Sequence, residues 1–292
     1  MRYVLITPVR DEVRFIELTI KSVVAQTVRP LKWVIVSDGS TDGTDDIVSK
    51  YASENPWIEL IRMPERRERH FAGKVYAFEA GYANVREMKY DAIGSLDGDV
   101  SFDKDFFVFL LQKLAGDDSL GLVGASYIES SKEAYDYVFS SVDDVPGACQ
   151  LFRRECFEDV GGYTPLKEGG IDYVALIAAR MKGWRTRVFT DKVCIHHGTA
   201  QRSRSSARFK LGMKDYALGN DPLWELFRTF YQMTRRPFVL RGIMLGAGYL
   251  WAFASRQKRS ISQDMITFIR QDHTRRLRRV LVRFAPKVFP GI

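Results

Sequence analysis

The chain has 292 residues, 46% of them hydrophobic, which is enough to bury a substantial core and fits one large domain with an appendage rather than a repeat or low-complexity protein. Its net charge of +8 is unevenly divided: residues 200–292 hold 19 Lys and Arg against 5 Asp and Glu, whereas residues 1–199 hold 25 against 31. The three cysteines are widely spaced and the first residues lack the organisation of a signal peptide, so we expect reduced thiols in a cytoplasmic protein that is not exported.

Strand-like and helix-like runs alternate along the first two thirds of the chain. The strands are expected at residues 3–7, 33–37, 58–62, 92–96, 120–125 and 186–190, and the helices at 15–26, 45–51, 74–86, 106–114 and 173–181. This alternation is typical of an α/β fold with a mostly parallel sheet flanked by helices.

Polar loops follow three of these strands. The first reads Thr7-Pro8-Val9-Arg10-Asp11-Glu12, the second begins Ser37-Asp38-Gly39-Ser40, and the third is Asp97-Gly98-Asp99. Since ligands of open α/β sheets bind at the carboxyl ends of the strands, we expect the three loops to converge on one crevice. An Asp-x-Asp pair there can hold a divalent cation that neutralises a diphosphate, although Asp-Gly-Asp is also ordinary turn chemistry.

The order and spacing of these motifs resemble the family-2 glycosyltransferases of the GT-A fold over about residues 3–199. Further motifs that carry the resemblance are Gly73-Lys74, Gly161-Gly162-Tyr163 and Gly170-Ile171-Asp172. Two positions depart from the usual pattern, because Asp11 replaces an Asn and Ile171-Asp172 replaces a Glu-Asp pair.

The resemblance implies a site for the nucleoside of a nucleotide-sugar donor, with UDP favoured as the nucleotide. It places Thr7, Pro8, Arg10 and Glu12 along the base and ribose, and gives Asp38 a hydrogen bond to either. Asp38 could instead only cap its own turn. Lys74 follows a glycine at a predicted helix start, where it can hold phosphate, or it is simply an exposed lysine.

A metal site and a catalytic base follow from the same resemblance. Asp99 is the expected direct ligand of Mn²⁺ or Mg²⁺, while Asp97 contacts the ribose or joins the ion through water. Either His196 or His197 is a candidate third ligand; a structural histidine and a zinc site with Cys194 are the alternatives. Asp172 is the expected general base of an inverting reaction, or else a helix cap.

Other segments resemble the acceptor side of the family. Residues 147–150, Arg153 and Gly161-Gly162-Tyr163 resemble the family's acceptor wall. The segment Gln201-Arg202-Ser203-Arg204-Ser205 resembles the Gln-x-x-Arg-Trp motif of processive synthases, but Ser205 replaces the tryptophan on which a sugar would stack. We therefore expect a single sugar addition, with Arg202 and Arg204 available to the diphosphate.

After about residue 199 the alternation ends, and we expect residues 1–199 to form a catalytic domain, with a nucleotide-binding half to about residue 100 and an acceptor half beyond it. Residues 200–292 should form a helical, basic region. Residues 237–254 are largely apolar but interrupted by Arg241, which favours a surface or re-entrant membrane contact, or a helix packed on the catalytic domain.

Residues 261–284 have the pattern of a basic amphipathic helix. One apolar stripe contains Ile261, Met265, Ile269, Leu277, Val280, Leu281 and Phe284, with arginines at 275, 276, 278, 279 and 283 around it. This favours peripheral association with the anionic inner face of a membrane, and a purely structural helix is the alternative. No nucleic acid is expected, because the aromatics lie within apolar runs.

The sequence therefore predicts an inverting, metal-dependent glycosyltransferase that moves one sugar from a nucleotide-sugar to a polyprenyl-linked or oligosaccharide acceptor in polysaccharide biosynthesis. A metal-dependent nucleotidyltransferase is one alternative, although the first loop lacks the glycines of a phosphate-binding loop. A non-catalytic module that binds membrane or nucleic acid is the other. A dinucleotide enzyme is disfavoured because no Gly-x-Gly-x-x-Gly follows a strand.

Overall fold

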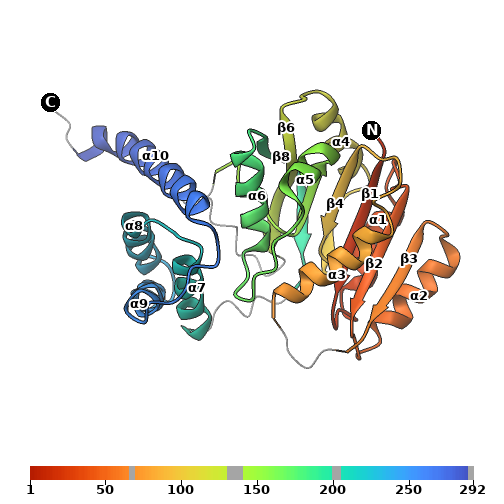
Figure 1. The fold of residues 1–292 in the computed structure, drawn as a ribbon, viewed down its shortest axis with the longest axis horizontal. Helices are drawn as coiled ribbons and strands as arrows, with labels where there is room; N and C mark the ends of the chain where they lie inside the picture. Colours follow the sequence, from red (N-terminus) through yellow and green to blue (C-terminus); the bar gives the residue numbers. More distant parts are fainter. Residues whose placement is uncertain (66–69, 130–140, 199–204, 289–292) are drawn as a thin grey trace. The chain divides into compact units, whose positions relative to one another are not determined.

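Eight strands form one sheet in the computed structural model of the protein, which describes residues 1–65, 70–129, 141–198 and 205–288 (Figure 1). The strands are β1 (Tyr3–Val9), β2 (Lys32–Asp38), β3 (Ile58–Met63), β4 (Ala92–Leu96), β5 (Val100–Ser101), β6 (Leu120–Glu129), β7 (Cys149–Arg153) and β8 (Arg185–His196). They belong to the first of two compact units, Met1–Thr199 and Ala200–Ile292.

The sheet is mostly parallel, with order β3-β2-β1-β4-β7-β6-β8-β5. Strands β3, β2, β1 and β4 are parallel to one another, as are β6 and β8. β7 runs antiparallel between β4 and β6, and β5 runs antiparallel to β8. The carboxyl ends of β1, β2 and β4 therefore meet at one edge, as expected for a site built from their loops.

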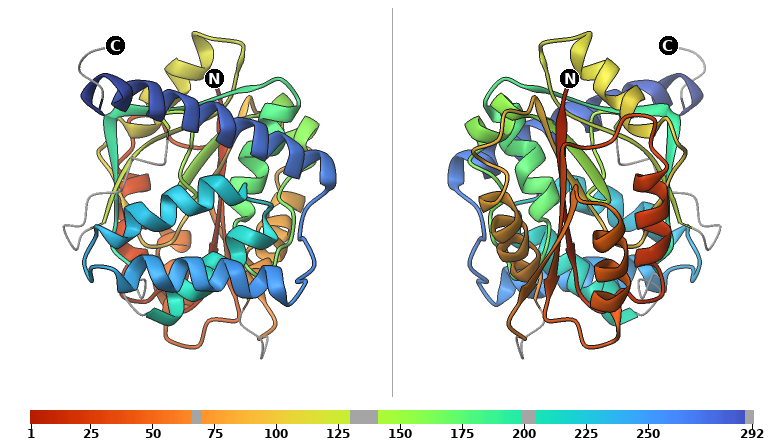
Figure 2. Two further views of the ribbon diagram at one scale, coloured as in Figure 1. Left: turned by 90° about the vertical axis from the view of Figure 1, so that its left-hand side faces the viewer. Right: turned by 90° about the vertical axis from the view of Figure 1, so that its right-hand side faces the viewer.

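Helices cover both faces of this sheet (Figures 1 and 2). They are α1 (Ile16–Val24), α2 (Thr44–Glu54), α3 (Ala72–Ala83), α4 (Phe106–Ala115), α5 (Arg154–Val160) and α6 (Ile171–Met181). Side chains alternate along β1: Tyr3 and Leu5 belong to the core that includes Ile16 of α1, whereas Ile6 lies against Gly81 of α3. Both faces of the central strands are thus buried, which explains their continuous apolar runs.

The predicted α/β class is confirmed, and each predicted strand and helix of this unit has a counterpart. Three elements were missed: β7, the two-residue β5 and the short helix α5. In addition, β6 and β8 continue past the predicted ends at residues 125 and 190. The added strand residues depend on pairing with distant strands, which hydrophobic periodicity does not reveal. The helix α5 has only seven residues, too few to show a helical period.

The second unit is helical, consisting of α7 (Ser205–Ala217), α8 (Pro222–Met233), α9 (Leu240–Ala254) and α10 (Gln263–Val288). Asp221 caps α8 by accepting hydrogen bonds from the backbone N–H groups of Leu223 and Trp224, at 2.9 and 3.1 Å, and Pro222 occupies the first turn. Within the described part of the chain, none of the helices combines the length and the apolarity needed to cross a bilayer.

The apolar stripe predicted over residues 261–284 differs in its surroundings from our expectation. Ile269 and Leu277 on α10 are buried, so this part of the stripe packs against protein instead of facing lipid. For Val280, Leu281, Arg283 and Phe284 the structure describes the backbone only.

Candidate active site

The loops after β1 and β2 are joined by a short hydrogen-bond network. Asp11 adopts a left-handed backbone with φ of 57°, a conformation that Asp and Asn tolerate better than most residues. Its N–H donates to Ser40 Oγ at 3.1 Å, and its Oδ1 accepts from the Thr41 N–H at 3.0 Å. The N–H of Glu12 donates to Thr44 Oγ1 at 2.8 Å. The two loops are therefore held together as one wall of the site, and Asp11 takes part in two of these three hydrogen bonds.

The residues expected along the nucleoside have different surroundings. Pro8 and Arg10 are partly exposed, and Arg10 lies 3.8 Å from the carboxylate of Asp38, measured between Nη1 and Oδ2. Thr7 does not line the site: it is buried, and its Oγ1 accepts a hydrogen bond from Trp33 Nε1 at 2.9 Å. Its place inside the sheet removes Thr7 from the expected nucleoside contacts.

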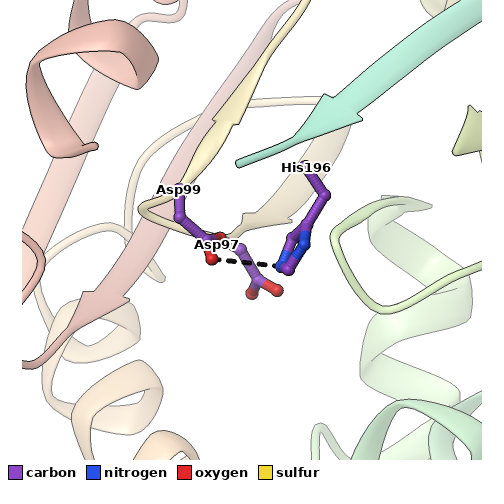
Figure 3. Close-up of side chains that lie close together, drawn as sticks. All are labelled: Asp97, Asp99 and His196. Atoms are coloured by element: carbon purple, nitrogen blue, oxygen red, sulfur yellow. Dashed lines mark ion pairs between the residues drawn. The ribbon is translucent and has the colours of Figure 1, made fainter. Parts of the chain in front are cut away.

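Asp97, Asp99 and His196 form a cluster in which one ligand atom from each lies within 4.8 Å of the other two (Figure 3). Asp97 follows β4, and Asp99 precedes β5, whose Val100 pairs with His196 at the end of β8. Asp99 Oδ2 lies 3.1 Å from His196 Nε2. The antiparallel β5–β8 pairing thus brings the histidine to the carboxylates across about a hundred residues of sequence.

Gly198 is a necessary part of this arrangement. A Cβ atom at Gly198 would lie 2.2 Å from Asp99 Oδ2 and 2.9 Å from His196 Cε1, closer than real Cβ atoms approach other groups. Gly198 is not among the predicted site residues, and the one signal for it in the sequence is its place two residues after His196.

His197 has other partners. Its Nε2 lies 2.7 Å from Ser101 Oγ, and its ring stacks on Phe15 with centroids 6.1 Å apart. Its backbone N–H donates to the carbonyl of Asp99 at 2.8 Å. Of the two candidate histidines, the structure therefore brings His196 and not His197 into the cluster.

The donor set fits a divalent cation. Two carboxylates and one imidazole are ligands that Mn²⁺ accepts, and Mg²⁺ favours the carboxylates. Cys194 is buried in the core on the same strand, and burial raises the pKa of its thiol well above the usual value. Among the described residues it is not part of this cluster, which disfavours the zinc alternative.

Lys74 links the carboxylate pair to the neighbouring pocket. Its ammonium forms an ion pair with Asp97 Oδ1. Burial alone would lower the pKa of Lys74, but attraction to Asp97 and then to Asp172 and Asp99 raises it overall. The pKa of Asp97 is raised mainly by burial, against the opposing effect of Lys74. Lys74 is therefore a charged group of the site and not a solvated surface lysine.

The carboxyl group of Glu12 is also affected by the two aspartates. Burial, together with the nearby carboxylates of Asp99 and Asp97, raises the pKa of Glu12 to about 7. A cation beside the two aspartates would oppose that shift, because it would favour the ionised form of Glu12.

A pocket lies beside Lys74 and contains Asp172. It is lined by Lys74, Val75, Phe78, Ser95, Gly147, Gln150, Tyr163, Ile171 and Asp172. Asp172 lies in the first turn of α6, where the cap position is taken by Gly170 with φ of 87°. It is therefore not the helix cap that was the alternative interpretation. Within the described residues, no hydrogen bond or ion pair engages its carboxylate.

Neighbouring residues fix the position of Asp172. A Cβ atom on Gly147 would lie 2.5 Å from Asp172 Oδ2, so only glycine leaves room for this carboxylate. Gln150 Nε2 donates to the backbone carbonyl of Asp172 at 3.3 Å, and the hydroxyl of Tyr163 donates to Gln150 Oε1 at 2.8 Å. Ser95, Val75 and Phe78 were not anticipated; the one signal was Ser95 as a polar residue within the apolar β4. Residues 201–204, with Arg202 and Arg204, lie outside the described residues.

Comparison with known families and curated proteins gives a consistent result. Residues 4–141 match the model of glycosyl transferase family 2. Poly-beta-1,6-N-acetyl-D-glucosamine synthase of Staphylococcus aureus is 25% identical over 170 residues, which are 52% of this chain and 39% of that protein. Chondroitin synthase of Pasteurella multocida is 27% identical over 116 residues, 40% of this chain and 11% of that protein. The chain thus spans less than half the length of these relatives.

Two solved structures share the fold. A mannosyltransferase from Pyrobaculum calidifontis, in complex with GDP-Man and Mn²⁺, has a TM-score of 0.58 at 20% identity and covers 92% of this chain and 78% of its own. TarS of S. aureus, in complex with UDP-GlcNAc, has a TM-score of 0.55 at 12% identity, with the same coverage. Residues 4–141, which carry the three loops and the carboxylate pair, are therefore similar to the family-2 glycosyltransferases, and the chain has the GT-A fold of these two structures.

Proposed function

We propose that this protein transfers a single sugar from a nucleotide-sugar to a hydroxyl group of a polyprenyl-linked or oligosaccharide acceptor, with inversion at the anomeric carbon. The observation that carries the proposal is the cluster of Asp97, Asp99 and His196, joined through Lys74 to the pocket of Asp172. The curated relatives are named as polysaccharide synthases, which supports a role in polysaccharide biosynthesis.

The donor would bind at the edge of the sheet formed by the first two loops. Pro8, Arg10, Glu12 and Asp38 are the groups available to the base and ribose, and Lys74 carries positive charge toward the diphosphate. UDP is favoured by the UDP-GlcNAc complex of TarS, while the GDP-Man complex of the other structure keeps GDP open.

Asp99 and His196, with Asp97, would hold Mn²⁺ or Mg²⁺. The ion supplies positive charge that stabilises the departing nucleoside diphosphate. Asp97 also pairs with Lys74, so the ion and the Lys74 ammonium would share this carboxylate. With Asp99 as the second carboxylate, the bound ion and Lys74 together would leave an excess of positive charge facing the diphosphate.

Asp172 would act as the general base. Its carboxylate takes the proton of the acceptor hydroxyl while the acceptor oxygen bonds to the anomeric carbon. The bond from that carbon to the diphosphate oxygen breaks, and its electron pair leaves with the nucleoside diphosphate. Gly147, Gln150 and Tyr163 support this role because they fix the helix start that carries Asp172.

The membrane is the proposed setting for the reaction, with peripheral association at an anionic cytoplasmic face. The excess of basic residues in 200–292 supports this, since that region contains 19 Lys and Arg but only 5 Asp and Glu. A polyprenyl-linked acceptor would be available at such a surface.

Calorimetric titration with UDP, GDP and dTDP, with and without Mn²⁺, tests the donor site. We expect one nucleotide to bind in a metal-dependent way, and Asp99→Ala to remove that dependence. Asp46→Ala, on the exposed surface of α2, is the control and should bind like the wild type. Failure of every nucleotide to bind under both conditions would refute the proposed transfer reaction.

A further inference from the structure

Exposed apolar side chains are concentrated in one short part of the second unit. Of the twenty large hydrophobic residues that are exposed in the described ranges, eleven lie between Leu223 and Phe253. Scattered exposed apolar residues are ordinary on a protein surface, whereas a contiguous group marks an interaction surface. The location of these eleven residues on their helices therefore decides whether they form a surface.

On α8 they form one stripe. Leu223, Leu226, Phe227 and Phe230 recur at helical spacing, and Phe230 is 58% exposed. The other side of the helix is buried through Trp224, which stacks on His273 of α10 with centroids 4.5 Å apart. One side of α8 is therefore buried against protein, and its apolar side is exposed among the described residues.

On α9 the same division occurs. Ile243, Leu250 and Trp251 lie on one stripe, with Leu250 65% and Trp251 60% exposed. The opposite side packs closely on α7, because a Cβ atom on Gly248 would lie 2.0 Å from the carbonyl oxygen of Phe209. One side of α9 is therefore buried within its own unit, and the other apolar side is exposed.

The two stripes face the same side. Gly242 and Gly246 of α9 lie against Met233 and Thr229 of α8, respectively, which shows that the helices run antiparallel and side by side (Figures 1 and 2). On each helix the exposed stripe is roughly a quarter turn from this line of contact, at about 100° per residue. Seen from one end of the pair, the residues of antiparallel helices advance in opposite directions of rotation. A quarter turn from the shared line of contact therefore leads to the same side on both helices, so the two stripes lie on one surface.

Charge around this surface has a single sign. Residues 226–263 contain seven Lys and Arg and no Asp or Glu. Arg235 and Arg236 are exposed in the loop between α8 and α9, beside Phe238, which is also exposed, and the Arg236 guanidinium lies over the Phe238 ring at 5.9 Å. An apolar surface bordered by cations complements a layer of anionic headgroups above acyl chains.

We infer that the exposed side of α8 and α9, with the loop that joins them, inserts into the headgroup region of an anionic bilayer. We call this surface the hairpin face and define it by Leu223, Leu226, Phe230, Phe238, Leu250 and Trp251. The inference rests on the proposed membrane association and deepens it, because it assigns lipid contact to α8 and α9 instead of the stripe of α10, in which Ile269 and Leu277 are buried. Aromatic rings among the six residues suit the membrane interface.

Vesicle binding by the full-length chain tests the hairpin face. Vesicles of phosphatidylglycerol and phosphatidylcholine are the probe, with phosphatidylcholine alone for comparison. The wild type should bind the anionic vesicles, and Phe230→Glu with Leu250→Glu should weaken binding by about tenfold or more, since two apolar side chains lose their burial. Arg235→Gln with Arg236→Gln should weaken binding to anionic vesicles by on the order of tenfold.

A matched control separates insertion from charge. Leu18→Glu with Gln271→Glu adds the same two negative charges at exposed helical positions outside the hairpin face, and should keep binding within about twofold. Emission from Trp251 should shift to shorter wavelength on anionic vesicles, and Trp251→Phe should remove most of this shift while the protein still binds. Equal losses in the face variant and the control would overturn the inference.

Two further measurements separate this inference from its rivals. Nucleotide titration of the same variants reports on the donor site. If a face variant loses vesicle binding but still binds nucleotide, the hairpin face is supported independently of the transfer reaction. If the wild type binds vesicles but no nucleotide, the transfer reaction is refuted and the membrane surface is not. Molar mass in solution tests a second copy of the chain as the occupant. A dimer that the face variant converts to a monomer, without vesicle binding by the wild type, would refute the membrane assignment.

Discussion

His196 and His197 are adjacent in sequence but differ in surroundings because successive side chains at the end of β8 point to opposite sides. His196 faces the carboxylate of Asp99, and His197 faces Ser101 and Phe15. A doublet of identical residues therefore contains one candidate metal ligand and one residue that holds the short β5 in place.

Substitution of each histidine should separate these roles. His196→Ala should weaken Mn²⁺-dependent nucleotide binding by about tenfold or more, because one ligand is lost. His197→Ala should bind nucleotide nearly as the wild type does, but unfold with a free energy lower by about 1 kcal/mol, since a hydrogen bond and a ring contact disappear. Calorimetry and urea unfolding would measure both. Equal losses of nucleotide affinity would contradict the assignment.

Asp172→Asn tests the proposed base while preserving the shape of the side chain. Transfer should fall by about 10²–10⁴-fold, because an amide cannot accept the acceptor proton. Nucleotide affinity should be unchanged, and so should thermal stability, since the cap of α6 is Gly170. A radiolabelled-sugar transfer assay beside nucleotide titration gives the comparison, with Asp46→Asn as the control. Full activity in Asp172→Asn would remove this residue as the base.

Helix packing in the second unit depends on glycines, a residue type that by itself disfavours a helix. Gly248 allows α9 to approach α7, and Gly212 of α7 allows the same approach from the other helix, with a Cβ there 2.0 Å from the carbonyl oxygen of Leu245. Gly246 has more room, since its Cβ would first meet Thr229 Cγ2 at 3.1 Å.

This difference predicts opposite results for two alanine substitutions on one helix. Gly248→Ala should lower the free energy of unfolding by about 2 kcal/mol or more, because backbone must move to admit the methyl group. Gly246→Ala should be close to neutral, since a gain of about 1 kcal/mol in helix propensity offsets a mild contact. Thermal unfolding of both variants is the measurement. A stable Gly248→Ala would mean that α7 and α9 are not packed as described.

The buried side of α8 contains a second testable feature, a cluster of charged groups. Arg228 pairs with Asp215 and lies 3.4 Å from Glu225, measured between Nη1 and Oε2. Burial, and to a lesser degree Asp215, raises the pKa of Glu225 to about 7 despite the attraction of Arg228. The folded protein therefore favours the protonated form of Glu225 at acidic pH.

The sign of the pH effect follows from this shift. A carboxyl group whose pKa is higher in the folded state stabilises the fold below its unfolded value of 4.5 and loses that contribution as pH rises toward 7. Glu225→Gln should remove this loss, so its unfolding free energy relative to the wild type should rise by on the order of 1–2 kcal/mol between pH 5 and pH 8. Urea unfolding at both values tests this; a constant difference would contradict the raised pKa.

At the scale of the whole molecule, charge and apolar surface are both unevenly distributed. The unit with the carboxylate cluster has more acidic than basic residues, and the second unit has 14 more basic than acidic residues. The exposed apolar side chains are also concentrated in that basic unit. An anionic surface would therefore attract one unit and not the other, which is consistent with chemistry in the first unit and attachment through the second.

The sequence alone determined the α/β class, the three converging loops, the Asp97–Asp99 pair and the similarity of the first half to a known family. Strand periodicity and turn chemistry are local properties, so they can be recognised without knowing which strands pair. The charge division between the two units is likewise a property of composition.

Tertiary structure decided what depends on distant contacts. Only the β5–β8 pairing selects His196 over His197, and only burial between sheet and helix removes Thr7 from the nucleoside site. The apolar stripe of α10 and those of α8 and α9 look alike in sequence. Which of them packs inward and which stays exposed follows from the packing of neighbouring helices, and no local pattern contains that information.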